Sequence, residues 1–275
     1  MHLKRWLTSL VALPLLVVLI LKGSPLLFSV FLGMVALLTS WEYSRIVTGS
    51  CNFHHSNPLF YVGLLAGAGL FCAAHAGFLA VMPLIFSFSL ILTGFLSFQQ
   101  FQNDPDISRK VALQTLGTIY IPLSISYLVL IRREPLGPEW VLLVVCVIFA
   151  GDTAAYYTGT YWGKHKLCPA VSPGKTVEGA CGGLVANIGI GLFFQICFFP
   201  AFPLQAIFVF CLVIGIAGQA GDLFESVLKR SAGVKDSGGL LPGHGGILDR
   251  IDALLFALPV AFFLKVFFLT QEGIR

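Results

Sequence analysis

The chain has 275 residues, of which 57% are hydrophobic and 11% are charged. A typical soluble domain has about 25% charged residues, so this composition excludes a water-soluble globule, a disordered chain and a nucleic-acid-binding domain. The net charge of +4 is also too small to indicate a nucleic-acid partner. We therefore expect an all-α polytopic membrane protein whose partner is the lipid bilayer.

Nine apolar runs approach or reach the length of about 20 residues that a membrane-spanning helix needs. Proline, asparagine and glycine between the runs support these divisions. The first run resembles a signal peptide, but no A-x-A cleavage pattern follows it, so we predict a retained helix. The predicted helices cover 6–21, 25–41, 58–74, 77–98, 112–131, 139–159, 179–199, 203–222 and 248–269.

The distribution of Lys and Arg predicts how these helices are oriented. With a cytoplasmic N-terminus, eleven Lys and Arg residues fall in cytoplasmic segments and five, including Lys265, on the opposite side. Arg132 and Arg133 lie on the less favoured side, and an error of one helix before them would reverse everything that follows. The predicted orientation places the polar segments 160–178 and 223–247 in the cytoplasm.

The two halves of the chain differ in where their charges lie. We expect a single integral membrane domain over 1–275, in which 1–110 is mainly helical scaffold and 111–275 carries the catalytic helices and loops. Carboxylates at membrane depth are costly and mark a functional site. They gather in the second half, at Asp152, Glu178, Asp222, Glu225, Asp236, Asp249 and Asp252.

Two pairs of carboxylates flank the longest polar segment. Asp222 and Glu225 are three residues apart at the end of one predicted helix, and Asp249 and Asp252 are three apart at the start of the next, so each pair shares a helix face. Such oxygen ligands suit Mg²⁺, which usually binds one or two carboxylates together with substrate phosphates. We predict Asp222 and Asp249 as metal ligands. The alternative is a set of structural ion pairs with Lys229, Arg230 and Arg250.

The segment between these pairs combines cations, glycines and a histidine. Gly243, Gly245 and Gly246 free the backbone to offer N–H groups to phosphate oxygens. The segment leads into a helix N-terminus, which favours anions. We predict a phosphate site here rather than an ordinary charged loop, with an anion-attracting strip of Lys229, Arg230 and Lys235.

A second polar segment contains Gly174-Lys175-Thr176, which is similar to the end of a Walker A loop. That motif also needs a glycine at position 169, where this chain has proline, and a strand-rich context, so a P-loop NTPase is excluded. Lys175 remains as a point charge suited to a phosphate, and a helix is expected to begin near Thr176. Asp152 lies inside a predicted helix and should face a polar cavity or a partner.

The stretch from Ser226 to Asp252 resembles the C-terminal signature of the phosphatidate cytidylyltransferases, also called CDP-diacylglycerol synthases. The segment around Asp152-Thr153 and the loop from Ser172 to Gly179 look like that family as well, whereas residues 1–110 share only a similar hydropathy. The signature residues are Ser226, Lys229, Arg230, Lys235, Asp236, Pro242, His244, Gly245, Gly246, Asp249, Arg250 and Asp252.

The resemblance implies transfer of CMP from CTP to phosphatidic acid, which gives CDP-diacylglycerol and pyrophosphate in phospholipid biosynthesis. Mg²⁺ is the implied cofactor, and a second, monovalent cation and a homodimer are left open. The implied location is the bacterial inner membrane, with the site on the cytoplasmic side. Because the phosphate of the acceptor lipid is already anionic, no strong general base is needed. The site must hold two polyanions and neutralise charge on the leaving pyrophosphate.

The resemblance also assigns roles to residues, although it does not decide which loop takes CTP. The implied catalytic residues are Asp222, Asp249, Lys229, Arg230, Lys235, Asp236 and His244. The implied substrate-binding residues are Asp152, Ser172, Lys175, Thr176, Glu178, Gly245, Gly246 and Arg250.

Two alternative functions remain. One is a CTP-dependent enzyme that acts on another lipid, such as an archaeal diether phosphate or a polyprenol. The other is an ion-coupled transporter that uses Asp152 and Asp222. Transport would need carboxylates along a transmembrane path, whereas the sequence gathers them at one interface.

Overall fold

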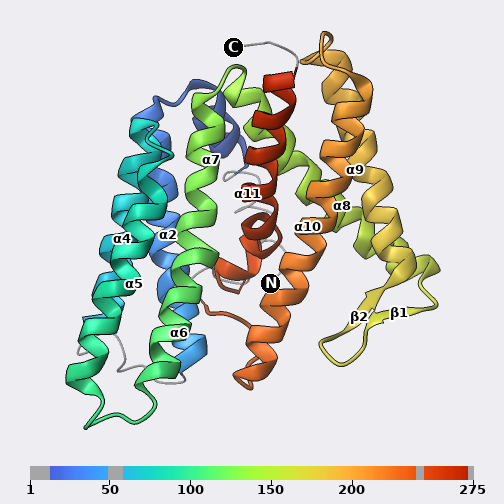
Figure 1. The fold of residues 1–275 in the computed structure, drawn as a ribbon. Helices are drawn as coiled ribbons and strands as arrows, with labels where there is room; N and C mark the ends of the chain where they lie inside the picture. Colours follow the sequence, from blue (N-terminus) through green and yellow to red (C-terminus); the bar gives the residue numbers. More distant parts are fainter. Residues whose placement is uncertain (1–12, 49–57, 240–244, 272–275) are drawn as a thin grey trace. The chain divides into compact units, whose positions relative to one another are not determined.

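The computed structural model describes residues 13–48, 58–239 and 245–271, and most of them are helical (Figure 1). Eight helices in these ranges are long and apolar enough to cross a membrane, which confirms the predicted all-α polytopic fold. The chain is an integral membrane protein. A shorter apolar helix covers Leu13–Lys22, and the first predicted helix, 6–21, lies partly outside the described residues.

The chain divides into two compact units, which are described separately. The first comprises residues 1–133 and 231–250, and the second comprises 134–230 and 251–275. Segments far apart in the sequence therefore meet within each unit. Most of the polar segment that resembles the family signature belongs to the same unit as the N-terminal helices, although it lies far from them in the sequence.

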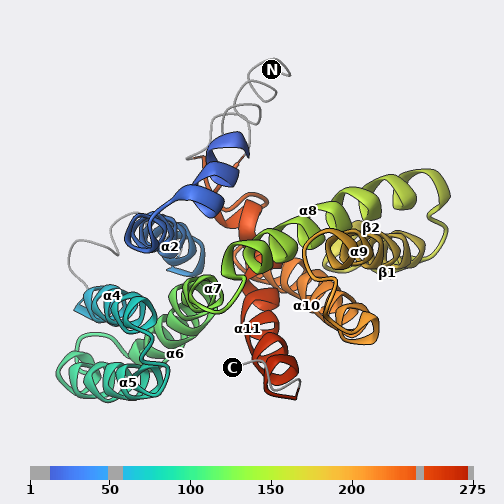
Figure 2. The ribbon, with the colours of Figure 1, turned by 90° about the horizontal axis from the view of Figure 1, so that it is seen from above.

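The first unit is a bundle of helices that pack side by side (Figures 1 and 2). α4 contacts α2, α5, α6 and α7, and α2 also contacts α6 and α7. The helices are α2 (Pro25–Thr48), α4 (Pro58–Ala76), α5 (Val81–Gln100), α6 (Ile107–Thr118), the π-helical turn η1 (Ile119–Leu123) and α7 (Ser124–Arg133).

The π-helical turn η1 lets one membrane-length helix pass through a proline. Pro122 has no N–H to donate and interrupts a regular α-helix. Ser124 Oγ donates to the carbonyl oxygen of Ile119 at 3.2 Å, across this turn. On α4, a Cβ on Gly67 would lie 3.2 Å from Pro122 Cβ. Because of this turn, the helix runs from Ile107 to Arg133 without a break.

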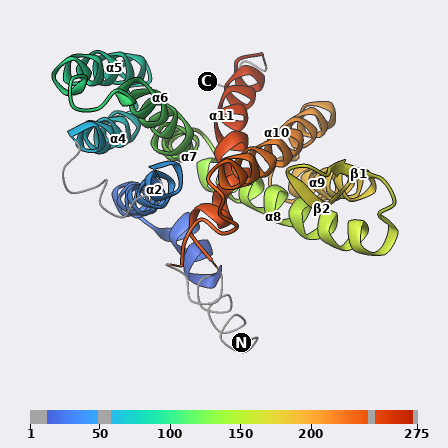
Figure 3. The ribbon, with the colours of Figure 1, turned by 90° about the horizontal axis from the view of Figure 1, so that it is seen from below.

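The second unit pairs two helices through a short β-hairpin. Its elements are α8 (Gly137–Trp162), β1 (Lys166–Cys168), β2 (Ser172–Thr176), α9 (Val177–Cys197), α10 (Leu204–Ser231) and α11 (Leu248–Gln271). The last residue of α10 and the first three residues of α11 belong to the first unit. β1 and β2 are antiparallel, with Lys166 opposite Thr176. Figures 2 and 3 show α8 and α9 side by side with the hairpin at their ends.

Glycines bring the backbones of α8 and α9 close together. A Cβ on Gly179 would lie 2.7 Å from the carbonyl oxygen of Ala155, and one on Gly183 would lie 2.9 Å from that of Gly151. No side chain can yield at these points, because the opposing atoms are backbone. Small residues at these positions therefore let the two helices pack with their backbones close together.

An aromatic core and a buried lysine hold the far end of this unit. The ring of Trp140 lies 4.7–5.4 Å from the rings of Phe199, Phe202 and Phe210. Lys265 of α11 is 0% exposed; its Nζ donates to the carbonyl oxygen of Pro135 at 3.1 Å and lies 5.6 Å from the centroid of Trp140. The positive-inside count treats Lys265 as an exposed charge, which is wrong, because a carbonyl and an aromatic face hold its ammonium inside the protein.

Candidate active site

A polar cavity of about 640 Å³ lies in the second unit, where α8, the hairpin, the start of α9 and α10 meet. Its wall combines two carboxylates, two lysines, hydroxyl groups and several glycines. Such a mixture can hold a polyanion together with a cation. Five predicted site residues line it, namely Asp152, Ser172, Lys175, Thr176 and Asp222.

An ion pair crosses this cavity from the hairpin to α10. Lys175 Nζ lies 2.5 Å from Asp222 Oδ2, and the two side chains are 26% and 31% exposed. Asp152 of α8 interacts electrostatically with both. Lys175 therefore offsets the mutual repulsion of the two carboxylates, which would be strong in a partly buried site.

Thr176 fixes the position of Lys175 by capping α9. The backbone of Thr176 is extended, and its Oγ1 accepts the N–H of Gly179 at 3.1 Å. This is the expected N-cap geometry, and it confirms a helix start near Thr176. A Cβ on Gly163 would lie 2.7 Å from Thr176 Oγ1, so the loop that faces the cap needs glycine there.

Glu178 lies outside the cavity wall, in the first turn of α9. Its Oε2 accepts the N–H groups of Lys164 at 3.0 Å and His165 at 3.2 Å. Its Oε1 lies 2.6 Å from His165 Nδ1. Glu178 thus ties the end of α8 to the start of α9, and the structure shows no contact with the cavity that would support its predicted substrate-binding role.

The cations at the end of α10 contact protein groups. Lys229 pairs with Glu225 one turn earlier, and Glu225 is fully buried. Arg230 Nε donates to the carbonyl oxygen of Val171 in the hairpin turn at 3.4 Å. The alternative of a structural ion pair therefore applies to Glu225 and Lys229, and Arg230 connects α10 to the hairpin.

Carboxylates of α10 and α11 come together beside the cavity. A Cβ on Gly221 would lie 2.7 Å from the carbonyl oxygen of Asp252, and Asp252 interacts electrostatically with Asp222 and Glu225. Within the described ranges, no group of three or more His, Cys, Asp and Glu residues could hold a metal ion alone. Mg²⁺ usually takes one or two carboxylates and completes its shell with water and phosphates, so this donor set fits Mg²⁺ in the presence of a polyanionic substrate.

The second predicted metal ligand, Asp249, belongs to the first unit. Its Oδ2 accepts hydrogen bonds from Ser237 N at 3.0 Å, Ser237 Oγ at 2.8 Å and Gly246 N at 2.9 Å. Gly245 has a φ of +83°, a conformation that favours glycine. Asp249 therefore organises the signature segment, and one of the N–H groups predicted to bind phosphate is already bonded to it.

The other signature residues are more open. Lys235, Asp236 and Arg250 are exposed in the first unit. His244 lies outside the described residues. Because Asp222 belongs to the second unit, the structure leaves the predicted pairing of Asp222 with Asp249 as a prediction.

Two polar residues of these sites are absent from the sequence predictions. Gln219 lines the polar cavity and donates from Nε2 to the carbonyl oxygen of Ala180 at 2.9 Å. Glu42 of α2 is buried against the signature segment. The predicted helix 25–41 ends one residue before Glu42. A lone carboxylate within an otherwise apolar stretch was the signal that could have identified it.

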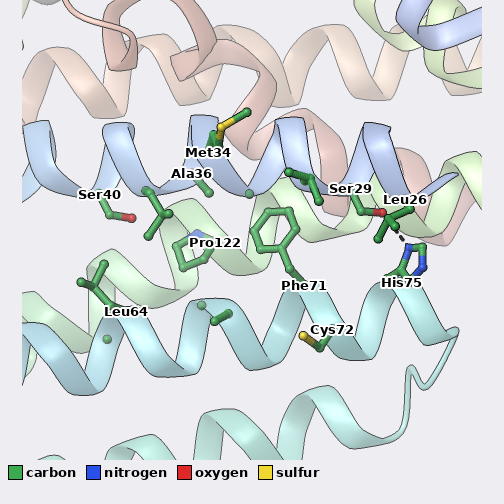
Figure 4. A pocket seen from close by; sticks show the side chains of 16 residues that line it. Leu26, Ser29, Met34, Ala36, Ser40, Leu64, Phe71, Cys72, His75 and Pro122 are labelled. Carbon is green, nitrogen blue, oxygen red and sulfur yellow. Dashed lines mark hydrogen bonds between the residues drawn. The ribbon is translucent and has the colours of Figure 1, made fainter. Parts of the chain in front are cut away.

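A second cavity of about 450 Å³ lies in the first unit, between α2, α4 and Pro122 (Figure 4). None of the described residues that line it is Lys, Arg, Asp or Glu. Ser29 Oγ and His75 Nδ1, 3.0 Å apart, form a hydrogen bond at one end. This cavity offers little to a polyanion, so the polar cavity of the second unit is the candidate active site.

Comparison with known proteins agrees with this chemistry. Residues 3–268 match the profile of the cytidylyltransferase family. Over 160 residues the chain is 42% identical to the phosphatidate cytidylyltransferase of Bacillus subtilis, which covers 58% of this chain and 60% of that protein. Proteins of the same name from Staphylococcus saprophyticus and Staphylococcus aureus are each 33% identical, over 93% of this chain and 96% of theirs.

Proposed function

The chain belongs to the cytidylyltransferase family, and we propose that the polar cavity of its second unit is where it transfers CMP from CTP to phosphatidic acid. The products are CDP-diacylglycerol, a precursor in phospholipid biosynthesis, and pyrophosphate. One observation carries the proposal: Lys175 meets Asp222 inside a cavity that also contains Asp152. An amine and two carboxylates are the groups needed to hold a nucleoside triphosphate and its counter-ion.

The reaction itself makes modest demands on the protein. A phosphate oxygen of phosphatidic acid attacks the α-phosphorus of CTP, and the bond between that phosphorus and the bridging oxygen of pyrophosphate breaks. The attacking oxygen is already anionic, so no residue has to remove a proton from it. The protein must bring two polyanions together and stabilise the charge that grows on the pyrophosphate.

Lys175 is the residue placed to provide that stabilisation. It is held on β2, beside the capped start of α9, where the helix dipole also favours negative charge. In the structure its ammonium pairs with Asp222. When a triphosphate enters, we expect Lys175 to bind a phosphate oxygen and to release Asp222.

Mg²⁺ fits the carboxylates of the site, and Asp222 is the residue that we expect to hold it, with Asp249 as the partner that the family resemblance implies. The bound ion would withdraw charge from the leaving pyrophosphate. Asp152 lines the same cavity and gives it a second carboxylate beside Asp222. A monovalent second cation and a homodimer remain predictions.

We also propose that the site faces the cytoplasm across a bacterial inner membrane. The hairpin and its flanking loop carry Lys164, Lys166 and Lys175, as the positive-inside rule expects of a cytoplasmic segment. Single cysteines at Ser172 and at the exposed Lys235, in a chain without its seven native cysteines, should react with a membrane-impermeant thiol reagent only after the inner membrane is opened. Reaction of either from the outside would reverse this orientation.

Incorporation of α-labelled CTP into lipid tests the proposed function. The purified protein in lipid nanodiscs should transfer label to chloroform-soluble material when phosphatidic acid and Mg²⁺ are present, and a chelator should stop it. Parallel reactions receive a diether phosphate or a polyprenyl phosphate as acceptor. Label that enters only the diether phosphate or only the polyprenyl phosphate would assign the chain to that lipid. No transfer to any acceptor would reject the proposal.

A further inference from the structure

The carboxylate of Glu42 lies within the first unit, against the signature segment about 200 residues later in the chain. Glu42 is 0% exposed. Its Oε2 accepts the N–H of Leu248 at 2.8 Å and lies 3.4 Å from the hydroxyl oxygen of Ser237. Burial of a charged or polar group costs free energy unless it is hydrogen-bonded. These two contacts therefore offset part of the cost of burying the Glu42 carboxylate in the helical bundle.

The signature segment packs directly on this carboxylate with its backbone. A Cβ on Gly238 would lie 2.7 Å from Glu42 Oε1, and one on Gly246 would lie 2.6 Å from Glu42 Oε2. A Cβ at either position would force the carboxylate to move. Glu42 therefore explains the glycine at 238, and Glu42 together with Ser237 Oγ, which would lie even closer to the added Cβ, explains the glycine at 246.

The contacts of Glu42 continue to Asp249. Leu248, which donates to Glu42, is the first residue of α11, where N–H groups have no partner within the helix. Ser237 contacts Glu42 through its hydroxyl and donates to Asp249 through both its hydroxyl and its N–H. Glu42 thus contacts Ser237 and Leu248, and Ser237 and Gly246 in turn donate hydrogen bonds to the Asp249 carboxylate.

We propose that Glu42 is a positioning residue that fixes the described residues 237–239 and 245–249 and, through them, the direction of the Asp249 carboxylate. The inference rests on the proposed catalytic role of Asp249. An apolar residue at position 42 would leave the Leu248 N–H without its acceptor and would remove the carboxylate that packs against Ser237. The first turn of α11 would then loosen, and Asp249 would sample orientations that do not serve the reaction.

Three variants of Glu42 and one control test the proposal. Glu42→Ala removes the acceptor. Glu42→Gln keeps an oxygen acceptor of the same reach. Glu42→Asp keeps the charge but withdraws it by one methylene, and it serves if Glu42→Ala fails to fold. The control is Thr39→Ala, because Thr39 is also fully buried on α2 and its hydroxyl donates within the helix, to the carbonyl oxygen of Val35.

Two measurements distinguish positioning from general destabilisation. Amide hydrogen exchange of the peptide 235–250 should become about tenfold faster in Glu42→Ala and in Glu42→Asp, but not in Glu42→Gln or Thr39→Ala. The value of kcat should fall about tenfold in the same two variants, with the KM of CTP nearly unchanged, because misdirection of Asp249 affects the transition state more than ground-state binding.

Unchanged exchange in Glu42→Ala, or equal effects from Thr39→Ala, would overturn the proposal. So would additive losses of kcat when Glu42→Ala is combined with Asp249→Asn, because the two residues would then act independently. Failure of the proposed function has a different signature. In that case Asp249→Asn alone would turn over normally, while the exchange data would still report whether Glu42 fixes the segment.

Discussion

The two cavities of this chain sit in one membrane protein and have opposite chemistry. The cavity of the first unit is lined by apolar side chains, with a serine–histidine hydrogen bond at one end (Figure 4). The cavity of the second unit contains Asp152, Lys175 and Asp222. Charges at membrane depth are tolerated where they have partners or serve a function. The contrast lies in the charged side chains, which line only the second of these two cavities, where Lys175 offsets the carboxylates.

The sharpest test of this contrast is the loss of one charge from the polar cavity. Asp222→Asn keeps the size of the side chain but removes a ligand and the partner of Lys175. We expect CDP-diacylglycerol formation to fall by about 10²-fold, or about 2.7 kcal/mol in the activation barrier. The matched control is Asp104→Asn, which breaks the Lys110–Asp104 ion pair of the first unit. Comparable losses in both variants would remove the distinction between the units.

A glycine in the wall of the polar cavity should tolerate an added methyl group less well than a glycine elsewhere on α9. Gly179→Ala places a methyl group 2.7 Å from the carbonyl oxygen of Ala155, whereas Gly189→Ala on the same helix meets nothing within 4 Å. We expect Gly179→Ala to destabilise the protein by about 1–3 kcal/mol and Gly189→Ala to be neutral or slightly stabilising. Thermal unfolding in detergent measures both. Equal melting temperatures would mean that α8 and α9 are not closely packed in the protein.

Removal of the amine from the polar cavity should act on one substrate. Lys175→Ala should raise the KM of either CTP or phosphatidic acid by about tenfold and leave the other nearly unchanged, since a lost ground-state contact appears in KM. Lys110→Ala, at the ion pair of the first unit, should change neither. Steady-state kinetics with each substrate varied in turn gives the answer. Equal effects of Lys175→Ala on both KM values, or none, would make Lys175 an interfacial charge without a substrate contact.

The smallest effect is expected in the apolar cavity. Ala68 lines it and is exposed, so Ala68→Leu fills part of it without a polar change. We expect the specific activity to stay within about twofold of the unchanged chain, because nothing in the reaction requires this space. A tenfold loss in the lipid-labelling assay would show that the first cavity takes part in the reaction after all.

Hydropathy predicts the helices well and their ends poorly. The predicted helix 203–222 stops at the first carboxylate, but α10 continues to Ser231. It can do so because Glu225 and Lys229 pair across one turn, which carries the helix past the apolar stretch. The predicted helix 25–41 likewise stops before a carboxylate, Glu42, while α2 continues to Thr48. A count of charges cannot anticipate a partner that lies elsewhere in the chain.

The candidate site was predictable where its residues share a local motif. The spacing around Lys175 and Thr176 predicts a helix start and a phosphate-sized charge, and the structure places both residues in the polar cavity. The hairpin of β1 and β2 was expected only as a polar loop, because strands of three and five residues have no periodicity to detect. Its position beside an apolar stretch marks Glu42 as a residue of interest, but the sequence does not predict its partners, which lie about 200 residues later.

The buried Lys265 has a consequence for how the protein enters its membrane during synthesis. A lysine at the centre of a transmembrane helix costs about 2.5–3.5 kcal/mol on translocon-insertion scales, and this value is an upper bound for Lys265, which lies nearer the end of α11. The carbonyl of Pro135 and the ring of Trp140, which receive its ammonium, lie on a segment that is synthesised about 130 residues earlier. The groups that receive the Lys265 ammonium are therefore already synthesised when α11 leaves the ribosome. We expect α11 to be more stable when packed against them than when alone in lipid.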